Sequence, residues 1–226
     1  MAIDATDTTL GSAGVSPPRL VSVNVGKPRS VDSGRRSVTT AIWKNPVEGR
    51  VRVSGVNLAG DDQADRTVHG GPEKAVYAYA IEETRAWEAD VGRELGPGTF
   101  GENLTTEGLD VSGALIGERW RIGTTLLEVV QPRLPCFKLG LRMNDPRFVK
   151  RFARASRPGA YLRIVEEGEL AAGDQISIEV ASLPDHGVTM RLVSDAILLD
   201  HSLIPQVLEA QQLIPSLREW MTDLVS

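Results

Sequence analysis

The sequence predicts an α+β protein that is mainly β: a β-barrel with flanking short helices, followed by a C-terminal three-helix appendage. Three observations predict this class. Short segments rich in Val, Ile and Thr recur through the first 182 residues, separated by Gly, Pro and Asn turns, which is typical of strands. Few helical segments lie between them, which favours an antiparallel or mixed barrel over a doubly wound sheet. Beyond residue 187 the apolar residues follow a helical period instead.

Most of the expected strands precede the single cysteine. They cover residues 19–25, 37–43, 51–58, 74–80, 98–108, 119–123 and 125–131. One helix is expected among them, over residues 81–92, and it ends at Gly92 because glycine commonly stops helices. Residues 19–131 are therefore expected to consist mainly of strands joined by turns.

After the cysteine the sequence predicts one more helix and two more strands. The helix covers residues 144–156, with Asp145 as the N-cap and Pro146 at the first helical position. The strands cover residues 160–168 and 174–182. The Glu-Gly-Glu sequence between them predicts that they pair as a hairpin.

A three-helix unit of about forty residues follows a boundary at residues 183–187. Pro205 and Pro215 stand where first helical turns would begin. A unit this small is not very stable alone, so we expect it to pack on the barrel or on a partner, and it offers an element for a homodimer. The expected organisation is a disordered tail over residues 1–18, a barrel over 19–183 and helices over 188–226.

Composition and charge exclude several classes of protein. The net charge of −5 argues against a generic nucleic-acid binder, and no stretch approaches the roughly 20 apolar residues that span a bilayer. The N-terminus has neither the basic nor the apolar region of a secretory signal. A single cysteine excludes an internal disulfide and an iron–sulfur cluster held by several cysteines. These features predict a cytoplasmic protein with no membrane partner and no specific nucleic acid.

One stretch of this acidic chain is strongly basic. Between residues 131 and 158, Asp145 is the single acid among eight cations, which are Arg133, Lys138, Arg142, Arg147, Lys150, Arg151, Arg154 and Arg157. Such a block can bind an anionic ligand, or it can be the solvated face of a helix.

The lone cysteine, Cys136, lies inside this basic block in "QPRLPCFKLG". Pro135 favours a helix start close to Cys136, and the partial positive charge of a helix start and nearby cations stabilise a thiolate. The thiolate is the form that binds metals and attacks electrophiles. A packed, unreactive cysteine is the alternative, and the neighbouring Arg133, Pro135 and Lys138 leave both interpretations open.

Three further motifs contain candidate site residues. The His69-Gly70-Gly71 turn can bring backbone N–H groups close to an anion, although a plain turn with an exposed histidine also explains it. Asn103, in "FGENL", can bind the edge of a polar heterocycle or can simply occupy a tight turn. Lys44, in "TAIWKNPVEG", is either a site cation or a surface lysine.

Taken in chain order, these motifs resemble a known family. The segments "TAIWKNPVEG", "GDDQADRTVHGGPEKAVYAY", "FGENLTTEGL", "GERWRIG" and "VVQPRLPCFKL" resemble MOSC-domain proteins of the YiiM type. The resemblance covers residues 20–182, and residues 188–226 are similar to the small three-helix domain that follows MOSC in this group. In place of the family's Ser-Ala-Ile, this chain has Thr40-Ala41-Ile42, which keeps the hydroxyl group.

The resemblance implies a MOSC-type β-barrel and a molybdenum cofactor (molybdopterin), with no role for pyridoxal phosphate. It implies that Cys136 is the metal ligand and that Arg133 and Lys138 hold the pterin phosphate or tune the thiolate. Thr40, Lys44, Asn103 and the His69-Gly70-Gly71 turn would line the cleft. His69, whose unperturbed pKa lies near neutrality, is the candidate proton donor, with a packing or turn role as the alternative.

The activity that the resemblance implies is reduction of N-hydroxylated compounds to amines, with 6-hydroxylaminopurine, hydroxylamines and amidoximes as examples. The electrons would come from a separate flavin or iron–sulfur protein, because the sequence contains no flavin or NAD fingerprint and no cluster cysteines. One alternative is a protein that carries the cofactor, or a persulfide on Cys136, without turnover. Another is a protein that binds nucleic acid or nucleotides through its basic block.

Overall fold

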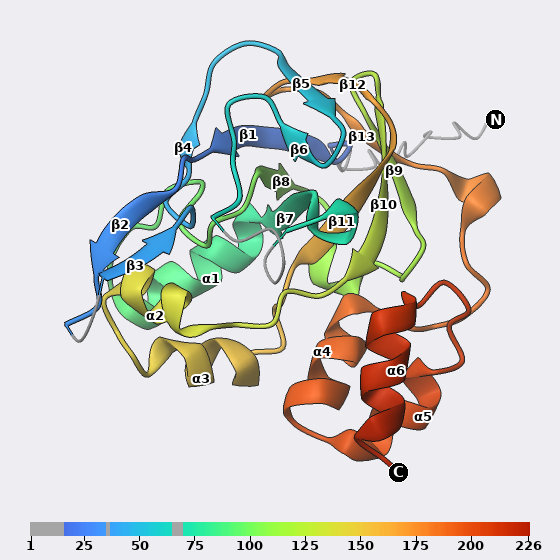
Figure 1. Cartoon of the computed structure of the whole chain (residues 1–226). Helices are drawn as coiled ribbons and strands as arrows, with labels where there is room; N and C mark the ends of the chain where they lie inside the picture. Colours follow the sequence, from blue (N-terminus) through green and yellow to red (C-terminus); the bar gives the residue numbers. More distant parts are fainter. Residues whose placement is uncertain (1–15, 35–36, 65–69) are drawn as a thin grey trace, which may run out of the picture.

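A computed structural model describes residues 16–34, 37–64 and 70–226 (Figure 1). Residues 1–15 of the predicted disordered tail (residues 1–18) lie outside the described residues, and so does His69. Within the described ranges, no helix is both long enough and apolar enough to cross a membrane.

The main element is a curled eight-stranded mixed sheet with the strand order β13-β9-β10-β11-β7-β8-β1-β4. Its strands are β1 (Arg19–Val25), β4 (Asn45–Pro46), β7 (Val76–Ala80), β8 (Leu104–Glu107), β9 (Arg119–Ile122), β10 (Thr125–Gln131), β11 (Ala160–Glu166) and β13 (Ile176–Ile178). The β7–β8 pair is parallel, and the other pairs of this sheet are antiparallel.

The sheet curls so far that β13, at one edge, meets β1, which lies next to the other edge. Arg19 forms a bridge with Gln175, just before β13, and the Leu20 amide donates to the Asp174 carbonyl at 2.9 Å. This contact nearly closes the sheet, and the mainly β half-barrel confirms the fold class that the sequence predicts.

Two smaller sheets extend this half-barrel. One contains β12 (Gly168–Leu170), β5 (Val51–Ser54) and β6 (Asn57–Leu58), and the other is the hairpin of β2 (Arg29–Asp32) and β3 (Ser37–Thr40). The expected strand over residues 51–58 is thus divided at Gly55, which has a left-handed φ of 62°. The β2–β3 hairpin extends away from the main sheet in Figure 1.

The structure corrects the predicted hairpin of residues 160–168 and 174–182. β11 pairs with β10 and β7, whereas β13 pairs with β9. Between them, β12 leaves the main sheet and pairs with β5. The Glu-Gly-Glu sequence therefore redirects the chain to a second sheet, in which residues 168–170 pair with residues 51–53 of β5.

The α-helices lie on one side of the sheet in Figure 1. They are α1 (Ile81–Val91), α2 (Phe137–Met143), α3 (Phe148–Arg154), α4 (Met190–Leu198), α5 (Ile204–Val207) and α6 (Pro215–Asp223), and short 3-10 turns cover η1 (Pro72–Lys74), η2 (Val111–Gly113), η3 (Val180–Ser182) and η4 (His201–Leu203). α1 ends at Gly92 in the left-handed conformation, as expected. α3 starts later than predicted, because Asp145 caps a preceding turn by accepting the Arg147 amide at 2.9 Å.

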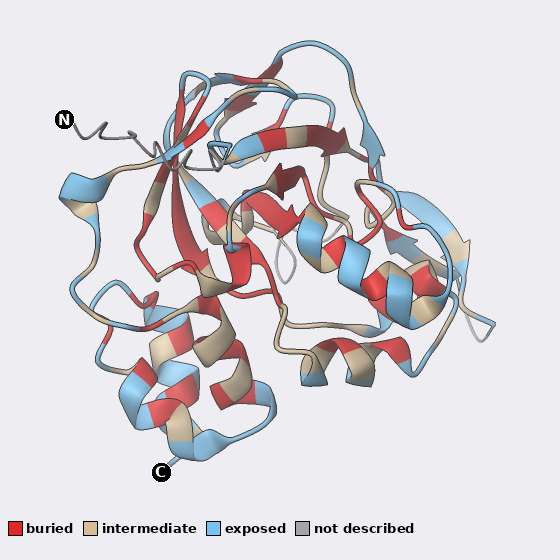
Figure 2. Cartoon of the chain, turned by 180° about the vertical axis from the view of Figure 1, so that it is seen from behind, coloured by how far each residue is buried: buried red, intermediate tan, exposed pale blue. Residues whose placement is uncertain are grey.

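Two groups of buried side chains fill the molecule. An aliphatic core lines the inside of the half-barrel and continues into α4, α5 and α6, so the C-terminal helices pack on the barrel. A separate aromatic layer contains Tyr77, Tyr79, Trp87, Phe100, Phe148 and Phe152 and lies between the sheet and the helices α1, α2 and α3. The buried colour in Figure 2 marks both the strands and the helix faces turned towards them.

Candidate functional site

A cleft opens at the end of the sheet where β10 ends and where β7, β8 and β11 begin. Four segments from distant parts of the sequence form its walls: the chain after β3, the chain after β6, the loop before β8 and the chain after β10. Six of the predicted site residues line it together, namely Thr40, Lys44, Asn103, Arg133, Cys136 and Lys138.

Cys136 lies on the cleft wall as a half-buried free thiol. It is the N-cap residue of α2, as the sequence predicts, with an extended backbone (φ −125°, ψ 171°). Its carbonyl accepts the Leu139 amide at 2.9 Å, which fixes the first turn of the helix. Lys138, on that same turn, also lines the cleft. The thiol is therefore held on a short, fixed turn beside a cation.

Arg133 is buried, with 6% of its surface exposed, yet it forms no ion pair with a described residue. Its Nη1 donates to the Phe100 carbonyl, and its guanidinium lies 5.1 Å from the centroid of the Tyr77 ring. Burial works against the charge, but Tyr77, Tyr161 and Cys136 raise the pKa of Arg133 above its ordinary value. Aromatic faces stabilise a desolvated cation, so Arg133 remains charged at the cleft wall.

Lys44 is a second buried cation, and it differs from Arg133 because it has a carboxylate partner. Its Nζ lies 2.5 Å and 2.6 Å from the two oxygens of Asp61, which also accepts the Gly26 amide at 2.7 Å. Burial lowers the pKa of Lys44, while Asp61 opposes that shift. An ammonium group has three N–H donors, so one remains for a ligand in the cleft.

The loop before β8 packs tightly behind these cations. Gly98 and Gly101 have left-handed φ values of 79° and 77°, and a Cβ atom on them would lie 2.5 Å from the Lys44 carbonyl and 2.7 Å from Ile42. Glu102, fully buried, accepts the amides of Gly98 and Phe100, and burial raises its pKa. Because Gly98 and Gly101 have no side chain, the loop can contact the segment after β3 that contains Lys44.

Asn103 lines the cleft, but its side chain is already bonded within the protein. Its Nδ2 donates to the Asn24 carbonyl at 3.2 Å and to Asp61 at 2.9 Å, while its Oδ1 accepts the Tyr77 amide at 3.1 Å. Both amide hydrogens are therefore used, and the bond to Asp61 fixes the carboxylate that holds Lys44.

The remaining candidates differ in their distance from the cleft. Thr40 is buried on the wall, and its Oγ1 accepts the Ile42 amide at 3.2 Å. Gly70 and Gly71 are not among the residues that line the cleft. The Gly71 amide donates to Gln63, which does line it, at 3.2 Å. His69 lies outside the described residues, so its predicted role stays a prediction.

Asp61, Tyr77 and Tyr161 are among the cleft residues that sequence analysis missed. Asp61 lies in the quoted "GDDQADRTVHGG" segment, and a buried cation such as Lys44 requires a partner of this kind. Tyr77 and Tyr161 occupy paired positions on β7 and β11, with ring centroids 5.0 Å apart. In the sequence these two tyrosines are aromatic residues within apolar strands, and such residues usually pack in the core, so nothing marked them as site residues.

The basic block of residues 133–157 is divided by the structure. Arg133 and Lys138 face the cleft, whereas Arg147 and Arg151 pair with Asp145 at 3.6 Å and 3.5 Å. Among the described lining residues, four cations (Lys44, Lys74, Arg133, Lys138) face two carboxylates (Asp61, Asp62), so the cleft carries excess positive charge within an acidic protein. This charge and one thiol suit an anionic ligand that contains a soft metal.

Comparison with known proteins agrees with this fold. The family model of the MOSC domain matches residues 65–177. YflK of Bacillus subtilis is 34% identical over 175 residues, covering 77% of this chain and 78% of that protein. The chain therefore belongs to the MOSC family.

Within this family the similarity is to the YiiM type. Protein YiiM of Escherichia coli is 32% identical, covering 67% of this chain and 68% of that protein. The crystal structure of YiiM from Geobacillus stearothermophilus has a TM-score of 0.75 and 28% identity, covering 93% of this chain and all of that one. A Gibberella moniliformis protein named "Reductase" is 36% identical over 72% of this chain, which spans only 29% of that longer protein.

Proposed function

We propose that this protein is a molybdenum-cofactor-dependent reductase that converts N-hydroxylated compounds to amines. The observation that carries the proposal is the free thiol of Cys136 on a cleft wall that also contains the buried cations Arg133 and Lys44. Membership of the MOSC family and the fungal relative named "Reductase" support it.

The residues of the cleft fit the cofactor. A thiolate is a soft donor that suits molybdenum bound to sulfur, and guanidinium and ammonium groups suit the phosphate of molybdopterin. When bound, the cofactor would supply the two-electron chemistry that removes the oxygen of the N–O bond. The overall reaction converts R–NH–OH, two electrons and two protons into R–NH2 and water, and a separate flavin or iron–sulfur protein would supply the electrons.

The chain's own residues would bind and orient. Cys136 would hold the metal, and Arg133 and Lys138 would hold the pterin phosphate. Lys44 would direct its third N–H into the cleft, with Asp61 as the positioning residue that fixes its ammonium. The aromatic wall around Arg133 excludes water, which strengthens the attraction between this guanidinium and an anion. The predicted proton donor is His69.

Substitution of the thiol tests the proposal directly. Cys136→Ser, produced in a host that makes the cofactor, should lose molybdenum, because the substitution removes the metal ligand. Its rate of reduction of an N-hydroxylated base should fall by at least about a hundredfold. Phe137→Ala is the matched control, since this adjacent side chain is 49% exposed, and it should retain both. Metal analysis and turnover with an artificial electron donor give the two readouts.

Full activity in Cys136→Ser would contradict the assignment of the metal ligand. Tight binding of the cofactor by the wild-type protein with no turnover on any N-hydroxylated compound would instead identify a carrier of cofactor or sulfur.

A further inference from the structure

Two arginines from separate elements meet at Trp43 beside the cleft, and a third arginine lies near one of them. The guanidinium carbon of Arg29, on β2, lies 4.2 Å from the centroid of the Trp43 ring, and that of Arg142, on α2, lies 5.8 Å from it. Arg93 follows the end of α1 and is close enough to Arg142 to lower its pKa. We call Arg29, Arg93 and Arg142 the arginine cluster.

The arginine cluster is only partly balanced by acid: the buried Glu102 acts on Arg142 and raises its pKa. None of the three forms a salt bridge with a described carboxylate. The Nε of Arg142 is buried and has no hydrogen-bond partner in the described part of the chain. Burial lowers the pKa of Arg142 and Glu102 opposes that shift, while Arg29 and Arg93 lower the pKa further. A buried donor without a partner and repulsion between neighbouring guanidinium groups both cost free energy. This cost indicates a ligand that supplies negative charge.

The other arginines of the basic block lie elsewhere, and one of them, Arg157, also has a buried guanidinium nitrogen without a partner among the described residues. Arg147 and Arg151 pair with Asp145, and the Arg151 guanidinium also donates to the Asp90 carbonyl. Arg157 lies outside the cluster, 5.0 Å from the centroid of the Trp87 ring. Arg142 differs from them because it shares the Trp43 ring with a guanidinium group from another element, that of Arg29.

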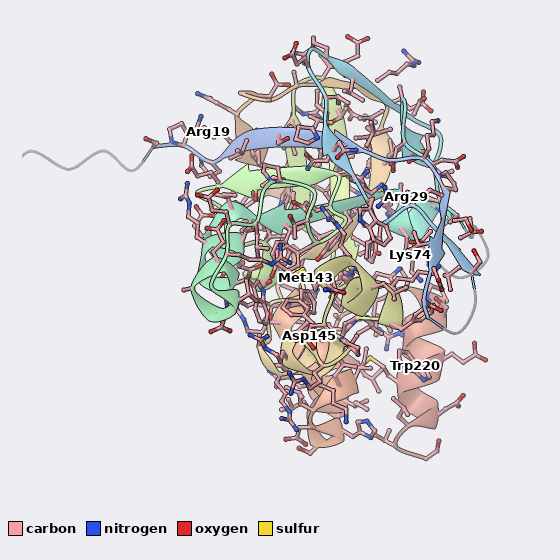
Figure 3. All side chains as sticks on the ribbon, turned by 90° about the vertical axis from the view of Figure 1, so that its left-hand side faces the viewer. Arg19, Arg29, Lys74, Met143, Asp145 and Trp220 are labelled. Carbon is pink, nitrogen blue, oxygen red and sulfur yellow. The ribbon has the colours of Figure 1, made fainter. Side chains whose placement is uncertain are left out.

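The cluster adjoins the cleft along the chain, although neither Trp43 nor the three arginines are among the residues that line it. Trp43 lies between Ile42 and Lys44, and both of these line the cleft. Lys138 and Arg142 are four residues apart on α2, so they share one face of the helix. Arg142 lies six residues after Cys136, or about 9 Å along the helix. Figure 3 looks onto this side of the molecule, with Arg29 on β2 and Met143 at the end of α2 labelled.

We infer that the arginine cluster binds a phosphate group of the substrate, so that the substrates include phosphorylated N-hydroxy compounds such as an N-hydroxylated nucleoside 5′-monophosphate. Guanidinium groups match the geometry of phosphate oxygens, and the Trp43 ring holds two of them in place. The spacing along α2 is comparable with the length of a nucleoside. This inference rests on the proposed function for the reaction, but the phosphate site itself does not.

The first test measures binding without turnover. Inorganic pyrophosphate should bind the wild-type protein at low salt, measured by titration calorimetry, and Arg142→Gln and Arg29→Gln should each weaken that binding about tenfold. Arg154→Gln, which removes an exposed cation from α3, is the matched control and should not weaken it. Equal binding by wild type, Arg142→Gln and Arg29→Gln would overturn the inference.

The second test uses the cofactor-loaded enzyme. For Arg142→Gln, KM should rise about tenfold more for the N-hydroxylated nucleoside monophosphate than for the same nucleoside without phosphate. Pterin content, measured by fluorescence after oxidation, should equal that of the wild type. Loss of pterin in Arg142→Gln would overturn the inference, since the cluster would then hold the phosphate of the cofactor.

The two tests separate failure of the inference from failure of the proposed function. Weakened pyrophosphate binding in Arg142→Gln, in a protein without reductase activity, would reject the reaction and retain the phosphate site. Reductase activity with the same KM ratio in wild type and Arg142→Gln would retain the reaction and reject the site.

Discussion

The aliphatic core and the aromatic layer are both buried, but they contain different chemistry. The core packs residues such as Leu127 and Val129 against the C-terminal helices. The aromatic layer packs Trp87, Phe148 and Phe152 close together, with ring centroids 4.8 to 6.4 Å apart. It also surrounds Arg133, whose guanidinium carbon lies 6.0 Å from the centroid of Phe152.

The difference shows how this fold buries a cation without an acid beside it. Aliphatic side chains have no favourable electrostatic interaction with a cation, whereas the face of an aromatic ring is negative and attracts one. The molecule therefore buries Arg133 against its aromatic layer, whereas the aliphatic core meets the cleft through partly buried residues such as Leu134 and Tyr161. We expect damage to the layer to affect both stability and site, and damage to the core to affect stability alone.

The largest expected effect follows from Phe152→Ala. Phe152 is 2% exposed and contacts four other rings, so its loss should lower the free energy of unfolding by about 3–5 kcal/mol. Chemical denaturation measures this. Molybdenum content per folded molecule should also fall, because Arg133 loses part of its support. Phe152→Leu, which keeps much of the volume, should restore most of the stability but less of the metal content.

A smaller effect is expected from Leu127→Ala on β10, at a residue with no exposed surface. The lost contacts and the remaining cavity should lower the free energy of unfolding by about 2–5 kcal/mol. Molybdenum content per folded molecule should stay at the wild-type level. A fall equal to that of Phe152→Ala would show that the two regions do not differ as we describe.

The smallest effect concerns Glu83, where α1 meets α4. Burial raises the pKa of Glu83 to about 7, and its Oε2 has no hydrogen-bond partner among the described residues. Below pH 4.5 the carboxyl is protonated in both states. As the pH rises towards 7, the unfolded chain loses this proton first, so stability should fall by on the order of 1–3 kcal/mol.

Glu83→Gln should remove this loss, because the amide resembles the protonated carboxyl. The measurement is the difference in unfolding free energy between pH 5 and pH 8, which should be smaller in the variant. Asp90→Asn, at an exposed position on the same helix, is the control and should keep the wild-type difference. Equal pH dependence in wild type and Glu83→Gln would contradict the prediction.

Local signals predicted several elements accurately. The strands over residues 19–25 and 125–131 are confirmed at both ends, and the helix that starts at residue 81 ends one residue before Gly92. The helix start after Cys136 is also confirmed. Each depends on neighbours in sequence: the β-branched and apolar content of a strand, a glycine that stops a helix, or a proline that starts one.

Strand pairing could not be predicted in the same way. The Glu-Gly-Glu sequence after β11 is compatible with a hairpin, and yet β12 pairs with β5, more than a hundred residues earlier. Pairing depends on which strand edge is free when the sheet curls, and no local pattern contains that information. The same holds for Asp61, which is 17 residues from Lys44 in sequence and 2.5 Å from it in space.

The sequence by itself determined the fold class, the motif order that identifies the family, and Cys136 as the central residue of the cleft. Only the tertiary structure decided which cations face that cleft. Arg133 is buried there against tyrosines, Arg147 and Arg151 are neutralised by Asp145, and Arg142 meets arginines from β2 and the end of α1. The residue type determines the charge of a side chain. Packing between elements far apart along the chain determines which groups that charge meets.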